Sequence, residues 1–208
     1  MANEHFSGPE KPKGISGSIF LWLMNRTHAK MANWGLQYLP IKDSNHILDI
    51  GCGGGANIHR MLKMADDLKV FGLDYSKLSV EKSREYNRDA KDKGKCEILE
   101  GSVSNIPYKE GAFDIVTAFQ TIFFWPDMVN DIKEVLRILK SGGIFFICNA
   151  GFISNDGNMA IGKFTRMRGM RLYSTKEYDS ILTECGFINI KINISNGKKL
   201  ICVIGEKP

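Results

Sequence analysis

The stretch that most constrains this chain is residues 46–57, where a short apolar run containing one acid is followed by four glycines within five residues. Ile47, Leu48 and Ile50 are typical of a buried parallel strand, and the glycines predict a tight turn after it. A helical spacing of apolar residues follows at once. Because glycine has free dihedrals and no side chain, this layout lets the backbone approach a nucleotide-like ligand closely.

A second acid favours a ligand site over an ordinary loop between a strand and a helix. The next predicted strand, Lys69–Asp74, ends in Asp74, which comes 23 residues after Gly51. Dinucleotide-binding folds place a ribose-binding carboxylate at roughly 20 residues from the glycine turn. The sequence therefore predicts a binding site at the carboxyl ends of two neighbouring strands.

The segment Asp49-Ile-Gly51-Cys-Gly53-Gly-Gly55, followed by Gly72-Leu-Asp74-Tyr75-Ser76, resembles the class I S-adenosylmethionine-dependent methyltransferases, whose first motif is D/E-x-G-x-G-x-G. The resemblance covers roughly residues 45–205. It implies S-adenosyl-L-methionine as the cofactor. It also implies an α/β fold, a doubly wound seven-stranded and mostly parallel sheet of the Rossmann-like methyltransferase type, closed by an antiparallel C-terminal β-hairpin.

By this resemblance, the motifs and their neighbours surround the cofactor. Its implied ligands are Asp49, Gly51, Cys52, Gly53, Gly55, Asp74, Tyr75, Ser76, Ser102, Val103, Phe119 and Gln120. Asp74 is expected to accept hydrogen bonds from both ribose hydroxyls. Ser102 replaces the aspartate that accepts a hydrogen bond from the adenine amino group in the family. A hydroxyl can accept that bond too, more weakly than a carboxylate.

The resemblance also locates the acceptor side. The substrate-binding candidates are Trp34, Phe123, Phe124 and Trp125, and His28 is the candidate general base by analogy with lid histidines. An exposed helix histidine is the alternative for His28. Arg166, Arg168 and Arg171 could contact a carboxylate on the substrate.

Two parts of the chain are expected. Residues 1–40 form a flexible segment and a helical lid, with helices at roughly 18–25 and 28–39, and residues 41–208 form the methyltransferase domain. Removing residues 1–39 is expected to leave a folded core. The remaining predicted elements are strands at 96–100, 113–119, 144–148, 188–194 and 200–204, and helices at 76–92, 126–141 and 174–185, with a short substrate-side insertion at 149–173.

Composition limits the other possibilities. At 208 residues and 43% hydrophobic, the chain can bury one core. Its net charge of +5 is spread among acids, so no nucleic-acid partner is expected. The five cysteines lack the spacing of a disulfide framework or a metal site, which fits a reducing cytoplasm. The apolar run Ile19–Met24 is too short to span a bilayer, so no membrane partner is expected. We also expect a monomer or homodimer.

The sequence thus predicts an S-adenosylmethionine-dependent methyltransferase that transfers a methyl group to a small-molecule acceptor by in-line displacement. Two alternatives stay open. One is a non-catalytic S-adenosylmethionine-binding module. The other is an NAD-dependent oxidoreductase, whose G-x-G-x-x-G fingerprint could be placed on Gly51, Gly53 and Ala56. The sequence leaves open whether O, N, S or C receives the methyl group.

Overall fold

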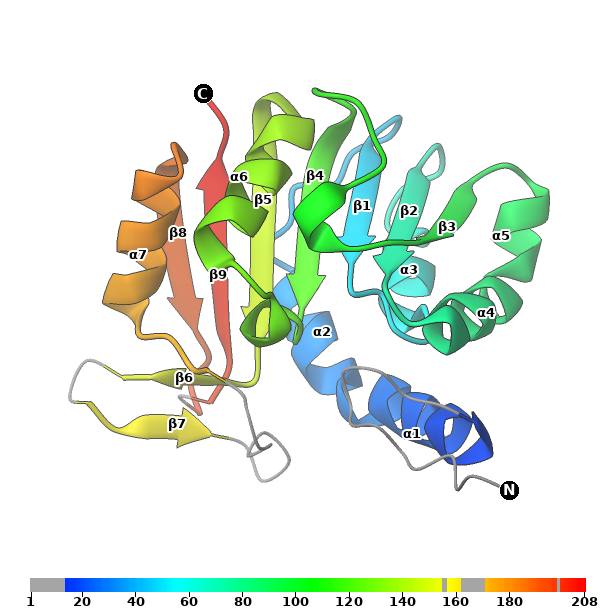
Figure 1. The fold of residues 1–208 in the computed structure, drawn as a ribbon, viewed down its shortest axis with the longest axis horizontal. Coiled ribbons are helices and arrows are strands. Elements are labelled where there is room, and N and C mark those ends of the chain that lie inside the picture. Colours follow the sequence, from blue (N-terminus) through cyan, green and yellow to red (C-terminus); the bar gives the residue numbers. More distant parts are fainter. Residues whose placement is uncertain (1–13, 155–156, 162–170, 198) are drawn as a thin grey trace.

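The computed structural model describes residues 14–154, 157–161, 171–197 and 199–208 and is built on one central sheet (Figure 1). Its strand order is β3-β2-β1-β4-β5-β9-β8. The strands are β1 (His46–Ile50), β2 (Lys69–Asp74), β3 (Cys96–Glu100), β4 (Phe113–Phe119), β5 (Leu139–Asn149), β8 (Ile188–Ile194) and β9 (Ile201–Glu206). A separate small sheet pairs β6 (Gly151–Ile153) with β7 (Met159–Ile161).

The pairing within the sheet confirms the predicted topology. Strands β1 to β5 pair in parallel, whereas β9 is antiparallel to both β5 and β8. The C-terminal hairpin therefore puts one reversed strand into an otherwise parallel sheet. The order changes direction between β1 and β4, and in open α/β sheets ligands bind beyond the carboxyl ends of the strands at such a switch point.

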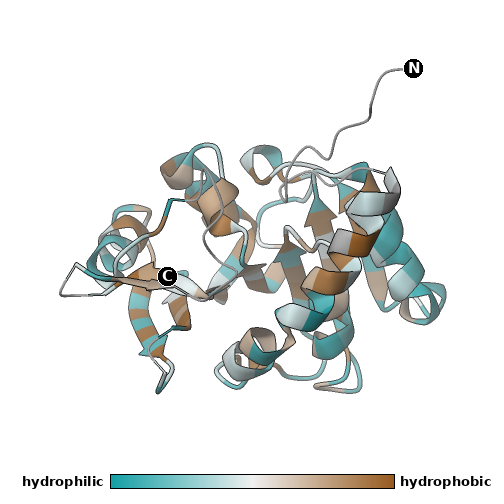
Figure 2. Ribbon diagram, turned by 90° about the horizontal axis from the view of Figure 1, so that it is seen from below, coloured by the Kyte–Doolittle hydropathy of each residue, from teal (hydrophilic) through white to brown (hydrophobic). Residues whose placement is uncertain are grey.

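Helices cover both faces of the sheet. They are α1 (Gly14–Thr27), α2 (Ala29–Leu36), α3 (Ala56–Met61), α4 (Lys77–Tyr86), α5 (Arg88–Asp92), α6 (Met128–Ile138) and α7 (Thr175–Glu184). One core cluster joins the sheet to α6 and α7, and the other joins it to α2, α3 and α4. The strands in the middle of the sheet are mostly hydrophobic (Figure 2). Within the described residues, every helix falls short of the length and apolarity that a bilayer crossing needs.

The helix predicted at 76–92 is broken at Asn87, which separates α4 from α5. The Asn87 backbone leaves helical geometry at φ −108° and ψ 24°. Its side-chain amide donates to the carbonyl oxygens of Gly55 and Ser83, each at 3.0 Å. A side chain that bonds to the backbone in this way competes with the helix, which explains the break.

Strand β5 begins five residues earlier than predicted, at Leu139, and α6 ends at Ile138. Leu139 pairs with Phe113, and a register irregularity follows before Ile144 pairs with Ile115. Gly142, at φ +72°, lies inside this irregularity. The glycine pair at 142–143 thus bends the start of a strand, whereas the sequence pattern assigned it to the end of a helix.

Helix α2 belongs to the core, so the expected boundary at residue 40 cuts through packed structure. Met31 is 3% exposed, and Ala32 and Leu36 are also buried in the cluster beneath the sheet. Gly35 lies so close to β5 that an added Cβ would be 2.6 Å from Cys148 Sγ. Removing residues 1–39 would therefore expose this core. The described residues of helix α1, by contrast, belong to neither core cluster.

We expect Gly35→Val to lower the free energy of unfolding by about 1–3 kcal/mol, because the new side chain overpacks the α2–β5 contact. Asn33→Val, at an exposed position of the same helix, is the control and should cost less than about 1 kcal/mol, since asparagine and valine have similar helix propensities. Urea unfolding of both variants measures the difference. Equal midpoints would show that α2 does not depend on this contact.

Candidate active site

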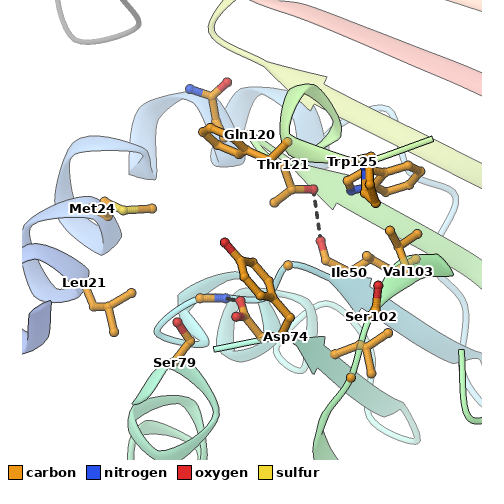
Figure 3. Close-up of a pocket in the computed structure, with 17 residues that line it drawn as sticks. Leu21, Met24, Ile50, Asp74, Ser79, Ser102, Val103, Gln120, Thr121 and Trp125 are labelled. Atoms are coloured by element: carbon orange, nitrogen blue, oxygen red, sulfur yellow. Dashed lines mark hydrogen bonds between the residues drawn. The ribbon is translucent and has the colours of Figure 1, made fainter. Parts of the chain in front are cut away.

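A cavity of about 410 Å³ opens beyond the carboxyl ends of β1, β2 and β4 (Figure 3). Strand ends, the glycine loop and α1 all contribute to its wall. Its lining residues are Leu21, Met24, Ile50, Gly51, Gly53, Leu73, Asp74, Tyr75, Ser79, Gly101, Ser102, Val103, Gln120, Thr121, Phe124, Trp125 and Pro126. The cavity thus lies at the switch point of the sheet, where the topology places a ligand.

The three motif glycines have positive φ angles but different surroundings. An added Cβ at Gly51, where φ is +69°, would collide with Thr121. At Gly55, where φ is +77°, it would collide with the side chains of Ser83 and Asn87. At Gly53, where φ is +52°, the nearest atom would be in Leu21 at 3.9 Å. Only Gly53 of these three combines a strained backbone with open space toward the cavity.

Asp74 both lines the cavity and orders the glycine loop. Its Oδ2 accepts a hydrogen bond from Gly53 N at 2.9 Å, and its Oδ1 accepts one from Ser76 N at 2.9 Å. Burial raises the pKa of the Asp74 carboxyl, and the hydrogen bonds from the backbones of Ser76 and Gly53 and from the Ser79 side chain oppose the rise. Because a carboxylate has about four acceptor sites, Asp74 can still accept a bond from a hydroxyl group of a ligand.

Asp49 lies beneath the loop and is not among the lining residues. Its side chain is 1% exposed, and Thr117 Oγ1 donates to Asp49 Oδ1 at 2.8 Å. Burial raises the pKa of Asp49 to about 7; the Thr117 bond opposes this shift and the charge of Asp74 adds to it. Asp49 therefore joins β1 to β4 through Thr117, and its pKa lies within the physiological range.

Ser102 and Val103 line the end of the cavity beside β3, as the resemblance implied for the adenine. Ser102 Oγ accepts a hydrogen bond from Ser104 N at 3.2 Å and caps a short 3-10 helix, Val103–Asn105. The hydroxyl keeps a hydrogen to donate and a further lone pair. An amide or amino group of a ligand could therefore still bond to Ser102.

The opposite end of the cavity is formed by the loop after β4. Gln120 adopts a positive φ of +58°, and its side-chain Oε1 accepts a bond from Ala150 N at 2.7 Å. Thr121 Oγ1 donates to Ile50 O at 3.2 Å. Trp125 lines the cavity and stacks on Phe145, with ring centroids 5.9 Å apart. The loop is thus fixed to β1 and β5, and it presents aromatic surface to the cavity.

Helix α1 forms the remaining wall through Leu21 and Met24. It is held to the glycine loop because Asn25 Nδ2 donates to Gly54 O at 3.3 Å. His28 lies in the turn between α1 and α2 and outside the lining, and burial lowers its pKa. Trp34 packs edge-on against Tyr38, with ring centroids 5.4 Å apart, and is also outside the lining.

The structure brings about half of the predicted site residues to the cavity. Those that line it are Gly51, Gly53, Asp74, Tyr75, Ser102, Val103, Gln120, Phe124 and Trp125. Those that do not are His28, Trp34, Asp49, Cys52, Gly55, Ser76, Phe119 and Phe123. Ser76 instead caps α4, and Cys52, Phe119 and Phe123 are buried in the core.

Sequence reasoning missed several lining residues, above all Leu21 and Met24, whose spacing of three along a helix could have indicated a shared face. Thr121 was also missed, although it closely follows the predicted strand. Of the basic residues in the insertion, Arg166 and Arg168 lie outside the described part of the chain. Arg171 lies over the Tyr173 ring at 4.9 Å, and its side chain is mostly exposed.

Comparisons with known proteins agree with this architecture. Residues 48–147 match the family model described as a methyltransferase domain. Over 107 residues the chain is 34% identical to 27-O-demethylrifamycin SV methyltransferase of Amycolatopsis mediterranei, a match that covers 50% of this chain and 38% of that one. The chain thus spans well under half the length of this relative.

Solved structures share the fold over most of the chain. A chain from a complex with the Haloferax volcanii Trm112 methyltransferase activator has a TM-score of 0.75 at 19% identity, covering 90% of this chain and 93% of that one. The [4+2]-cyclase SpnF has a TM-score of 0.73 at 16% identity, covering 98% and 86%. The match to a methyltransferase domain, together with the strand order of the sheet, supports a class I S-adenosylmethionine-dependent methyltransferase.

We expect Gly53→Val to abolish S-adenosylmethionine binding, because its side chain would enter the cavity. The variant should also lose about 1–3 kcal/mol of stability, since valine disfavours a positive φ. Gly94→Val is a matched control: Gly94 has a φ of +68°, and an added Cβ there meets no atom within 4 Å. The control should lose stability and keep binding. Calorimetric titration of both folded variants decides whether Gly53 faces the ligand.

We expect the stability advantage of Asp49→Asn over the wild type to grow as the pH rises. The folded pKa of Asp49 is raised to about 7, so the folded state keeps a proton that the unfolded chain releases above about pH 4. Wild-type stability is thus lost by up to about 1.4 kcal/mol per pH unit across this window, whereas the amide does not titrate. Urea unfolding at pH 5 and pH 8 measures it. The same difference at both pH values would contradict the raised pKa.

Proposed function

We propose that this protein transfers a methyl group from S-adenosyl-L-methionine to a small-molecule acceptor by in-line displacement. The observation that carries the proposal is the pairing of Asp74 with the glycine loop in the wall of the cavity, where Gly53 N donates to Asp74 Oδ2. The match to a methyltransferase domain supports the same cofactor. The match covers only part of the length of the relative, so the activity of the whole protein is part of this proposal.

The residues present fit this cofactor. Asp74 would accept hydrogen bonds from the two ribose hydroxyls, one through its remaining lone pair and one in place of the Ser79 hydroxyl. Ser102 and Val103 would flank the adenine, and the open space at Gly53 would admit the cofactor against the backbone. Tyr75, which is 41% exposed and lines the cavity, would cover the ribose side.

The chemistry needs orientation more than acid–base groups. Bound S-adenosylmethionine supplies an electrophilic methyl group on a sulfonium, so the protein has to align the acceptor and exclude water. Phe124, Trp125, Leu21 and Met24 line the cavity and present mainly apolar surface for both tasks. The aromatic rings of Phe124 and Trp125 also favour a nearby cation. His28 lies outside the lining, and the proposal assigns no step to it.

The acceptor in this proposal is an apolar or aromatic small molecule that enters between α1 and the loop after β4. Helix α1 is the lid, and α2 belongs with residues 41–208 in the body of the domain. The similarity to a methyltransferase named for a rifamycin derivative supports an acceptor of this kind. A cytoplasmic location, the absence of a nucleic-acid partner and a monomeric or homodimeric state stay predictions from the sequence.

The competing function is a module that binds S-adenosylmethionine without transferring its methyl group. The fold neighbour named as a [4+2]-cyclase favours keeping this candidate, because it has the same architecture and another reaction. The antiparallel β9 and the match to a methyltransferase domain argue against the oxidoreductase alternative.

Two measurements test the proposal. Calorimetric titration with S-adenosylmethionine, S-adenosylhomocysteine and NAD should give binding to the first two only, and selective NAD binding would overturn the cofactor. A screen of a small-molecule library with radiolabelled S-adenosylmethionine should then give a labelled product. Cofactor binding with no labelled product from any acceptor would favour the non-catalytic module.

We expect Asp74→Ala to weaken S-adenosylmethionine binding by about 100-fold, because two charge-assisted hydrogen bonds contribute on the order of 3 kcal/mol together. Asp74→Asn keeps the shape but loses the charge, so it should fall between the wild type and Asp74→Ala. Asp89→Ala, at an exposed position of α5, is the control. Calorimetry on folded variants gives the affinities. Wild-type affinity in Asp74→Ala would remove this carboxylate from the site.

A further inference from the structure

A second cleft, of about 890 Å³, also lies beside α1. It is bounded by α1 and α4, with further residues from α2, α3, α5 and the glycine loop. Its lining residues are Ser18, Leu21, Trp22, Asn25, Arg26, Ala29, Gly54, Arg60, Lys82, Glu85, Tyr86 and Arg88. Among the described residues, Leu21 alone lines both spaces, so the cleft is separate from the proposed methyl-transfer site.

The lining of this cleft is strongly basic. Four of its residues, Arg26, Arg60, Lys82 and Arg88, are cations and one residue, Glu85, is a carboxylate, which leaves a formal surplus of three positive charges. Glu85 is already engaged, because Lys82 Nζ donates to its Oε2 at 2.8 Å. The lining of this one cleft thus carries a formal charge of +3, compared with +5 for the whole chain.

Arg60 is held in place by neutral groups. Its Nη1 donates to Asn57 Oδ1 at 2.9 Å, and its Nη2 donates to Asn25 O at 3.3 Å. Burial lowers the pKa of Arg60, which means that its charge is less well solvated than in water. An anion in the cleft would compensate this charge, since guanidinium groups bind phosphate through paired hydrogen bonds.

Two aromatic side chains stand beside the cations. Trp22 is 58% exposed and Tyr86 is 53% exposed, and both line the cleft. The Arg26 guanidinium lies 4.9 Å from the centre of the Trp22 ring. Tyr86 packs edge-on against His59, with ring centroids 5.3 Å apart. The cleft thus offers cations for an acidic group and aromatic surface for an adjoining flat or apolar group.

We propose that the cleft between α1 and α4 binds the phosphate group of a phosphate-bearing ligand, with Arg60 and Arg88 contacting the phosphate and Trp22 and Tyr86 flanking the rest of the molecule. Three arginines from three different helices, α1, α3 and α5, line the cleft. A planar guanidinium can donate two parallel hydrogen bonds to two oxygens of a phosphate, which a monatomic halide cannot accept in the same way. The arginines therefore favour phosphate over a halide. The ligand is either a soluble phosphate compound or a phospholipid headgroup.

Inorganic pyrophosphate is the soluble probe, titrated calorimetrically into the full chain saturated with S-adenosylhomocysteine. Binding should persist in the presence of S-adenosylhomocysteine, because the two spaces share only Leu21 among the described residues. Co-sedimentation with phosphatidylcholine vesicles, with and without phosphatidic acid, is the second arm. Binding to pyrophosphate identifies a soluble ligand, and binding only to vesicles with phosphatidic acid identifies a headgroup; either supports the site.

Arg60→Gln and Arg88→Gln should each weaken binding about tenfold, as expected for one charge-assisted hydrogen bond. Arg60 donates a hydrogen bond to the α1 backbone, so Arg60→Gln could weaken binding by moving α1. Arg88→Gln removes a charge from the cleft and leaves that hydrogen bond in place. Lys133→Gln, at an exposed position of α6 on the other face of the sheet, removes the same charge and should leave binding unchanged. The proposal is overturned by failure of both probes, by competition with S-adenosylhomocysteine, or by equal losses in all three variants.

Discussion

The hydrogen bond from Gly53 N to Asp74 Oδ2 is the interaction on which the site depends. It joins the turn after β1 to the end of β2, two strands that pair in parallel. Positive φ angles at Gly51 and Gly53 let the loop reach the carboxylate. Because the protein itself satisfies one lone pair on each oxygen of Asp74, the carboxylate is oriented before any ligand arrives. Such preorganisation reduces the ordering that binding would otherwise require.

Much of the fold could be predicted from the sequence, because apolar runs and turn signals specify strands that are buried on both faces. The closing hairpin followed from the alternation at 188–194 and from Asn196-Gly197, and the antiparallel pairing of β9 confirms it. The break at Asn87 could not be predicted, since it depends on a hydrogen bond to Gly55, which is distant in sequence. The packing of α2 could not be predicted for a similar reason, because Gly35 and Cys148 are distant in sequence and come together only in the folded chain.

The positions of site residues along the chain were easier to predict than the directions of their side chains. Motif spacing pointed to Asp74, the family resemblance implied Ser102 and Gln120, and all three line the cavity. The motif gives no sign that its glycines have different roles. An added Cβ at Gly55 would collide with Ser83 and Asn87, whereas at Gly53 it would meet open space. His28 was chosen by analogy with lid histidines, and the turn between α1 and α2 places it away from the lining. Side-chain direction depends on how α1 packs against α4 and the glycine loop, and no local pattern specifies that packing.

Helices α1 and α2 are joined by backbone hydrogen bonds that continue through the junction between them. His28 N donates to Met24 O at 3.0 Å, and Ala32 N donates to His28 O at 2.9 Å, so backbone hydrogen bonds run across the junction at residues 27–28. Helix α2 is anchored in the core by Met31 and its neighbours, whereas α1 forms a wall of the cavity. A movement of α1 must therefore break hydrogen bonds at the junction or strain the packing of α2. Changes in the core packing around α2 should accordingly alter the position of the α1 wall of the cavity.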